Sequence, residues 1–183
     1  VLVANVLLYS RPRVGTVVKA RREWHLLDPD VLLWIMQSTP QNEFFNLLTS
    51  VRAVIEPAVA ALAAQHATEE EIAAIGEAYQ RMEAAPTPEA LLQPDLDFHS
   101  RIADATHNDL LAHLCNMLSL ALREALKHSN KRPNLHELAL PRHKAILTAI
   151  ENRDALGARH ATLVQLDDAR NALSVVLGRE LGL

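Results

Sequence analysis

The stretch from residue 42 to residue 64, NEFFNLLTSVRAVIEPAVAALAA, decides the fold class. Its larger apolar side chains recur at helical spacing, at Phe45, Leu48, Val51, Ile55, Ala58 and Leu62. Steps of three and four residues place side chains on one face of an α-helix, so the stretch predicts a long amphipathic helix. Pro57 lies inside it, and a proline removes one backbone hydrogen bond, so we expect a kink there.

Further helices are predicted on both sides of this stretch. Asp28-Pro29-Asp30 and the capping-box pattern of Thr68 and Glu71 are typical helix starts. We expect Pro94 to break the segment that follows Pro88, before another helix begins. The remaining helices are expected over roughly 29–38, 68–84, 95–105, 110–127, 138–151 and 154–178, which gives about seven in all.

Composition supports an all-α fold, an antiparallel bundle of about seven helices around one core. Only 5 of 183 residues are Gly and 4% are aromatic, whereas glycine weakens helices and aromatic residues favour strands. A formal charge of −4 with 49% hydrophobic residues excludes a disordered tail and a strongly basic nucleic-acid coat. The length suggests one main domain.

The first two dozen residues have a different character. Two β-capable runs, LLYS and TVVK, flank Arg11-Pro12-Arg13-Val14-Gly15 and predict a β-hairpin with a basic tip. Gly15 supplies the backbone freedom that such turns often need. An isolated hairpin is marginally stable, so we expect it to belong to a larger unit.

Cysteine content and hydropathy indicate the compartment. The single Cys115 cannot form an internal disulfide, which favours a reducing compartment, and we expect the cytoplasm. We find no secretory signal and expect no membrane span of about 18–20 apolar residues.

Three residues form a candidate metal site. Asp95 and His99 are four residues apart, about 40° around a helix, so both side chains project from one face. His143 lies on a later helix among apolar residues. If these groups converge, they would suit Zn²⁺, Ni²⁺, Mn²⁺ or Fe²⁺. The alternatives are an exposed Asp–His hydrogen bond and a hydrogen-bonded core histidine.

Arg52 is the second candidate, because its neighbours in the sequence are mostly apolar and a guanidinium keeps its charge when it is buried. It therefore needs an anionic partner. One interpretation is an internal salt bridge to Glu56 or Asp95, and the other is a fork that binds a ligand carboxylate.

Four sequence pieces, in this order, resemble the FCD effector domain of the FadR subgroup of GntR-family transcription regulators. They are Arg52-Ala-Val-Ile-Glu56-Pro57 with the following Ala67-Thr68-Glu69-Glu70-Glu71-Ile72, Asp95-Leu-Asp-Phe98-His99, Thr106-His-Asn108-Asp-Leu110-Leu111, and His143-Lys-Ala-Ile146-Leu147-Thr-Ala149-Ile150. The resemblance covers residues 23–178. Residues 1–22 resemble the tail, or wing, of the family's winged helix-turn-helix, whose recognition helix would precede Val1. Residues 24–34 are similar to members that respond to sugar acids.

The resemblance also implies roles for individual residues. The family's metal ligands fall on Asp95, His99 and His143, and its fourth ligand, usually a histidine, falls on Gln165. His160 is a poor substitute, since it lies about 140° away around the helix. The expected metal is zinc, with nickel or manganese as alternatives. Arg52, together with Gln165, would bind a small carboxylate effector.

The sequence therefore predicts a ligand-responsive, DNA-binding transcription regulator that acts as a homodimer. This chain would be mainly its effector-binding and dimerisation domain, residues 23–183, and Arg11 and Arg13 would contact DNA phosphates of the operator. The alternative is a metal-dependent enzyme acting on a small organic acid, since two histidines and a carboxylate also serve oxygenases and hydrolases.

Overall fold

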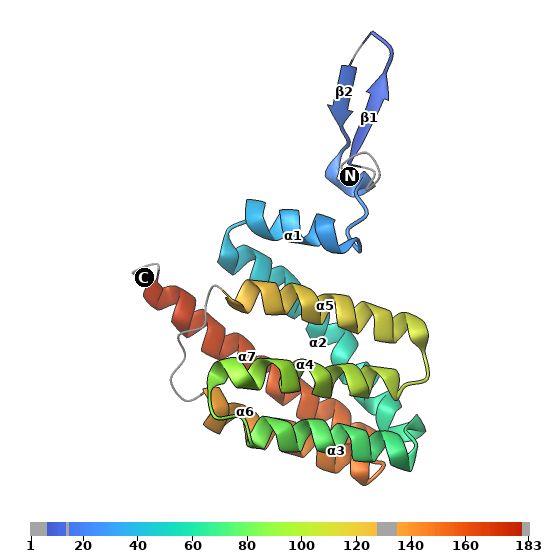
Figure 1. The fold of residues 1–183 in the computed structure, drawn as a ribbon, viewed down its shortest axis with the longest axis vertical. Helices are drawn as coiled ribbons and strands as arrows, with labels where there is room; N and C mark the ends of the chain where they lie inside the picture. Colours follow the sequence, from blue (N-terminus) through green and yellow to red (C-terminus); the bar gives the residue numbers. More distant parts are fainter. Residues whose placement is uncertain (1–6, 14, 128–134, 181–183) are drawn as a thin grey trace.

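The computed structural model describes residues 7–13, 15–127 and 135–180. A two-stranded hairpin and a short 3₁₀ helix precede a bundle of seven α-helices (Figure 1). The elements are β1 (Leu8–Arg11), β2 (Gly15–Val18), the 3₁₀ helix η1 (Arg21–Glu23), α1 (Pro29–Ser38), α2 (Gln41–His66), α3 (Glu69–Glu83), α4 (Pro88–Asp104), α5 (Asp109–Lys127), α6 (Leu135–Glu151) and α7 (Ala155–Glu180). The predicted all-α bundle with an N-terminal hairpin is confirmed.

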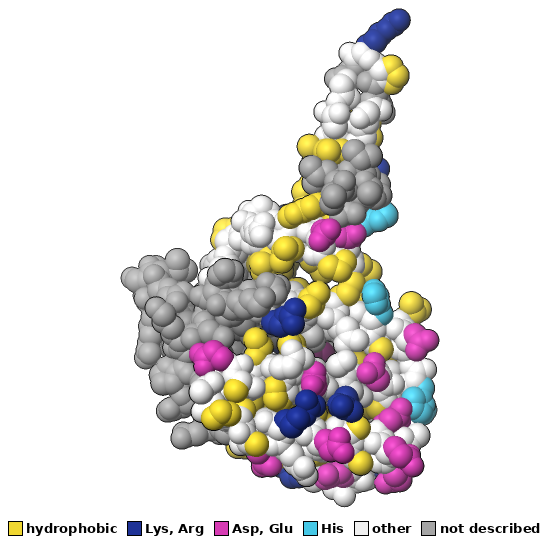
Figure 2. All heavy atoms as spheres, in the orientation of Figure 1, with side chains coloured by type: hydrophobic (Ala, Val, Ile, Leu, Met, Phe, Trp, Pro, Cys, Tyr) yellow, Lys and Arg dark blue, Asp and Glu magenta, His cyan; other side chains and the backbone are white. Residues whose placement is uncertain are grey.

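The hairpin projects away from the bundle, with α1 between the two (Figure 1). Its strands are antiparallel, with Leu8 opposite Val18 and Arg11 opposite Gly15. Gly15 has φ of 91° and Arg13 has φ of 65°, so the turn uses left-handed backbone at both positions. Arg13 is exposed, and Figure 2 shows a basic side chain at the hairpin tip; the side chain of Arg11 lies outside the described part.

Side-chain caps start the helices where the sequence predicts them. The Asp28 carboxylate accepts hydrogen bonds from the backbone N–H groups of Asp30 and Val31, and Pro29 follows as the first helical residue. Thr68 accepts from the N–H of Glu71, while Glu71 accepts from the N–H of Thr68, which completes the capping box. These local bonds satisfy backbone donors that a helix start otherwise leaves unpaired.

One predicted break is wrong. We expected the segment after Pro88 to end at Pro94, but α4 continues through Pro94 as a single helix. Proline removes only its own N–H from the hydrogen-bond ladder, and α4 packs against α3, α5, α2 and α6, so tertiary contacts outweigh that local loss. In the same way, α2 continues through Pro57 and α6 through Pro141.

Helix α2 runs through the centre of the bundle and joins two apolar clusters. Its N-terminal half contributes Phe44, Phe45 and Leu48 to a cluster with α1, α5 and the base of the hairpin. Its C-terminal half contributes Val59, Ala60, Ala63 and Ala64 to the main core with α3, α4, α6 and α7. Figure 2 shows hydrophobic side chains gathered where α1 meets the bundle.

Helix α2 is also, among the described residues, the one helix that passes a membrane-span test of length and composition. The sequence predicts no span there, because Arg52 and Glu56 interrupt the apolar run. Both charges are buried and paired with each other, and α2 packs most extensively against α7. These contacts identify α2 as the core helix of a bundle.

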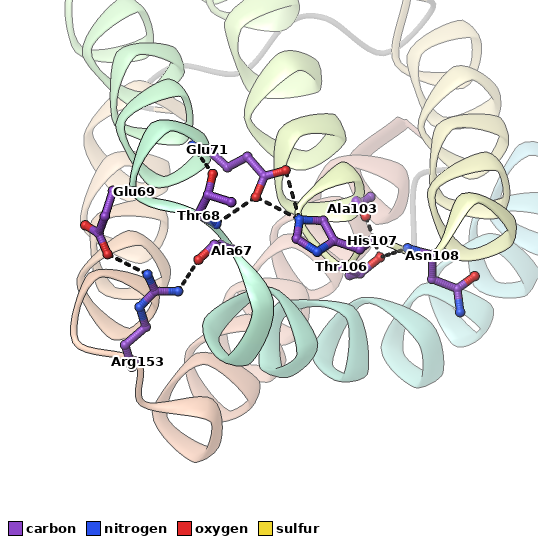
Figure 3. Close-up of polar contacts among 9 residues, drawn as sticks. All are labelled: Ala67, Thr68, Glu69, Glu71, Ala103, Thr106, His107, Asn108 and Arg153. Atoms are coloured by element: carbon purple, nitrogen blue, oxygen red, sulfur yellow. Dashed lines mark hydrogen bonds and ion pairs between the residues drawn. The ribbon is translucent and has the colours of Figure 1, made fainter.

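Three helices, α2, α4 and α6, end at one corner of the bundle (Figure 3). Arg153, after α6, donates hydrogen bonds to the Ala67 carbonyl after α2 and to Glu69 of α3. His107, after α4, lies 3.0 Å from Glu71 of α3. Arg153 and His107 both have left-handed backbone, with φ of 57° and 55°. These contacts join the turns after α4 and α6 to the N-terminal turn of α3, and Arg153 also joins the end of α2.

Candidate metal and carboxylate site

The side chains of Asp95, His99 and His143 converge at the edge of the core, where Asp95 and His99 are part-buried and His143 is buried. Asp95 and His99 come from α4 and His143 comes from α6. The His143 Nε2 lies 3.0 Å from the Asp95 Oδ1 and 3.2 Å from the His99 Nε2. The third separation, from the His99 Nε2 to the Asp95 Oδ1, is 4.0 Å. The three atoms thus surround one point.

Packing holds both imidazole rings in place. The buried Phe98 ring contacts His99 and His143 edge-on, with ring centroids 5.5 Å and 5.3 Å apart. His143 is 2% exposed. In the sequence Phe98 stands out only as a member of the Asp95–His99 motif, which does not predict its contact with both rings. Fixed rings are a condition for a site in which ligand atoms must lie within fractions of an ångström.

A backbone contact sets the protonation of His143. Its Nδ1 lies 2.8 Å from the Ala139 carbonyl oxygen, which can only accept a hydrogen bond, so Nδ1 carries a proton. The opposite nitrogen, Nε2, then faces the Asp95 carboxylate and His99. A carbonyl partner for one ring nitrogen, which leaves the other nitrogen to ligate, is common for metal-binding histidines.

Charges and burial shift the pKa values of all three groups. Burial alone would raise the pKa of Asp95, but the hydrogen bond and charge of His143 lower it to about 2. Burial alone would lower the pKa of His143, but Asp95 outweighs it and the pKa is raised. For His99 burial dominates and its pKa is lowered, which favours the neutral imidazole that ligates metals.

The residues present fit a divalent metal. Two atoms that each lie about 2.0–2.2 Å from a zinc ion, at tetrahedral or octahedral angles, are roughly 2.8–3.6 Å apart. Two of the three separations, 3.0 Å and 3.2 Å, fall in this range, and 4.0 Å corresponds to a wider angle. Two imidazoles and one carboxylate are a donor set that first-row divalent metals accept.

Arg52 forms a buried ion pair with Glu56, one of the two alternatives that the sequence left open. Its Nε donates to the Glu56 Oε1 at 2.5 Å and its Nη2 donates to the Glu56 Oε2 at 3.1 Å. Both side chains are nearly inaccessible, at 6% and 9% exposure. Burial alone would raise the pKa of Glu56, but the Arg52 charge lowers it, so the carboxylate is ionised.

Helix α2, which carries the ion pair, packs against α4 and α6, which carry the Asp–His cluster. The Arg52 charge lowers the pKa of Asp95, and the Glu56 charge opposes the lowering of the His99 pKa. In the sequence, Glu56 stands four residues after Arg52 in an apolar helix. That spacing predicts Glu56 as a salt-bridge partner of Arg52 and nothing more.

Gln165 is buried on α7, and its Oε1 has no hydrogen-bond partner among the described residues. Helix α7 packs against α2 and α6, which carry Arg52 and His143. A buried acceptor without a donor is costly, so this oxygen is suited to a donor or a cation that a ligand brings. His160, the weaker alternative, is exposed.

Comparison with known proteins agrees with this architecture. The FCD domain family model matches residues 48–168. The galactonate operon transcriptional repressor of Escherichia coli is 28% identical over 96% of this chain and 77% of its own length. A putative L-lactate dehydrogenase operon regulatory protein of E. coli is 30% identical over 90% of this chain, which spans 65% of that relative.

A solved structure, that of a GntR protein of Streptococcus agalactiae, has the same fold. It superposes with a TM-score of 0.62 at 20% identity, covering 93% of this chain and 77% of its own. The relatives are named as regulators, so the enzyme alternative loses its support. The chain therefore belongs to the FCD domain family of the GntR transcription regulators.

Proposed function

We propose that this chain is the effector-binding part of a transcription regulator, and that it binds a small carboxylate together with a divalent metal. The observation that carries the proposal is the convergence of Asp95, His99 and His143 beside the buried Arg52–Glu56 pair. A purely structural core has little use for such a group, because three of its ionisable side chains, Arg52, Glu56 and His143, are buried and burying them is costly.

Each residue has a role in this proposal. Asp95, His99 and His143 hold the metal, zinc in the first place, with nickel or manganese as alternatives. The metal supplies an electrophilic centre for an oxygen of the effector. Arg52 binds the carboxylate through its planar fork. The Gln165 oxygen, which has no partner among the described residues, accepts a hydrogen bond from an effector hydroxyl.

The chemistry of the relatives' names points to the effector class. They refer to operons of galactonate and of L-lactate dehydrogenase. Galactonate and lactate both carry a hydroxyl group beside a carboxylate. Such an acid offers one group to Arg52 and two oxygens to a metal, so we propose a hydroxy acid, such as a sugar acid, as the effector.

The N-terminal hairpin and the exposed apolar residues of α5 support two further parts of the proposal, DNA contact and dimerisation. We propose that residues 1–22 are the wing of a winged helix-turn-helix, with Arg11 and Arg13 near operator phosphates, and that residues 23–183 form a homodimer in the cytoplasm. Helix α5 exposes Leu110 and Leu120, and an apolar groove runs between α5 and α1. Effector binding would favour one dimer geometry and so change the fit to two DNA half-sites.

Native mass spectrometry and calorimetry test the site directly. Protein purified without a metal-affinity tag should retain one divalent metal per chain, and a chelator should lower its melting temperature, because removing a ligand of the folded state destabilises it. His99→Ala should remove metal and hydroxy-acid binding together, whereas His160→Ala, an exposed histidine of the same chain, should change neither. Absence of metal, with no thermal shift on adding Zn²⁺, Ni²⁺ or Mn²⁺, would overturn the proposal.

A further inference from the structure

The Glu56 carboxylate occupies only one edge of the Arg52 guanidinium. A guanidinium has two edges that can each bind a carboxylate through two parallel hydrogen bonds, Nε with one Nη and the two Nη groups with each other. Glu56 uses Nε and Nη2. Among the described residues Nη1 has no hydrogen-bond acceptor, so the described part of the chain leaves the second edge unused.

Glu56 also cancels the charge of Arg52 inside the site. Both side chains are buried, and α2, which carries them, packs against α4 and α6, which carry Asp95, His99 and His143. The guanidinium and the two carboxylates, Glu56 and Asp95, together carry one negative charge. Neutral imidazoles add none, so a divalent metal leaves the site with a single positive charge.

A buried region that carries net charge is unfavourable, because few solvent dipoles surround it. One effector carboxylate would bring this site to neutrality. A second carboxylate would leave one uncompensated negative charge beside Glu56 and Asp95. Without Glu56 the same site would carry two positive charges, and two carboxylates would balance them.

We infer that Glu56 is a specificity-determining residue, which restricts the effector to an acid with a single carboxylate. The inference rests on the proposed function and adds the charge of the ligand to it. In this role Glu56 orients the Arg52 fork and sets the number of negative charges that the site accepts. A merely structural ion pair would stabilise the fold without affecting the choice between mono- and dicarboxylic acids.

The test compares acids that differ only in the number of carboxylates. Calorimetry on the zinc-loaded full chain would use two matched pairs: galactonate with galactarate, and lactate with hydroxymalonate. For at least one pair, we expect the monocarboxylate to bind more than about tenfold tighter than the dicarboxylate, since like charges placed together oppose binding. This comparison needs no variant, so a failure of a variant to fold does not affect it.

Glu56→Gln then tests the residue itself, because it keeps the shape and one oxygen for Arg52 but removes the charge. We expect the preference for the monocarboxylate to shrink at least tenfold or to reverse, with zinc content unchanged. Glu70→Gln is the matched control, because it removes the same charge from an exposed position on α3 and should leave the preference intact.

Two results would overturn the inference while leaving the proposed function standing: equal binding of mono- and dicarboxylate by the wild type, or an unchanged preference in a folded Glu56→Gln variant. A different result, zinc retained and none of the four acids bound, would overturn both the inference and the proposed carboxylate effector. The two kinds of failure are therefore distinguishable in one set of titrations.

Discussion

Removing Arg52 should destabilise the protein far more than an average substitution. Arg52→Ala leaves the Glu56 carboxylate buried, with 9% of its side chain exposed and no guanidinium beside it. Breaking a buried ion pair from one side costs about 3–5 kcal/mol, since an uncompensated charge stays inside the fold. For a chain of this length each kcal/mol lowers the melting temperature by about 2–4 °C, so the decrease should be roughly 6–20 °C.

A double-mutant cycle separates the pair from the packing around it. Glu56→Ala should also destabilise, because it leaves the guanidinium unpaired, but Arg52→Ala with Glu56→Ala should cost less than the two single changes added together. Urea unfolding, followed by helical circular dichroism, would measure all four proteins. Additive costs, or a cost of Arg52→Ala below about 1 kcal/mol, would show that the pair is not buried and coupled as described.

Because Arg52→Ala should destabilise the fold, another variant is needed to test whether Arg52 binds the effector carboxylate. Loss of effector binding in Arg52→Ala could arise from unfolding alone, so the informative variant is Arg52→Lys, which keeps the charge opposite Glu56 and loses the fork. We expect weaker binding of the acid in Arg52→Lys, with metal content preserved because Arg52 is not a ligand. Calorimetry on the zinc-loaded variant would measure the affinity for the acid. An affinity equal to that of the wild type would refute binding of the effector carboxylate by the Arg52 fork.

Four further expectations follow from the same structure. Gln165→His should tighten metal binding, measured as the chelator concentration that removes half the metal, since it replaces an oxygen that has no partner in the described part of the chain with an imidazole. Glu71→Gln should cost about 0.5 kcal/mol at pH 6 by weakening the cap of α3. Hydrogen bonds from Thr68 and then His107 lower the pKa of Glu71. The stabilisation by the ionised Glu71 is therefore present above the unfolded pKa of about 4.3 and is lost as pH falls through the folded pKa. Melting curves recorded from pH 7 down to pH 3 should show the difference between wild type and Glu71→Gln shrinking. Analytical ultracentrifugation at micromolar concentration should find a dimer, and aspartate at both Leu110 and Leu120 should weaken it if α5 is the interface. Residues 1–183 alone should bind DNA with salt-sensitive affinity and without sequence choice, so a sequence-selective footprint would contradict the assignment of the hairpin as a wing.

Local interactions explain why most helix boundaries could be predicted. The caps at Asp28 and Thr68 use side chains within three residues of the groups they bind, so the sequence contains all that is needed. The effect of Pro94 could not be predicted in the same way. Whether one missing hydrogen bond ends a helix depends on how tightly the helix is packed by its neighbours, and α4 is packed by four of them.

The candidate site, too, was predictable where it depends on local spacing and not where it depends on the packing of helices. The spacing of Asp95 and His99 fixes their common face, because both lie on one helix. The approach of His143 depends on the packing of α6 against α4, and no spacing in the sequence states it. Arg52 is intermediate: its burial predicted an anionic partner, and the choice of Glu56 over Asp95 follows from an i, i+4 contact that a helix forms without tertiary help.

The turns that follow α4 and α6 both contact the start of α3. Arg153 and His107 reach from these turns to Glu69 and Glu71 in the N-terminal turn of α3. Both adopt left-handed backbone, which costs roughly 1 kcal/mol or more per residue outside glycine. Their ion pairs with α3 are exposed, so they offset only part of that cost. The convergence of His143 with Asp95 and His99, whose ligand atoms lie within 4.8 Å of one another, therefore depends on the apolar core that α4 and α6 share rather than on this corner.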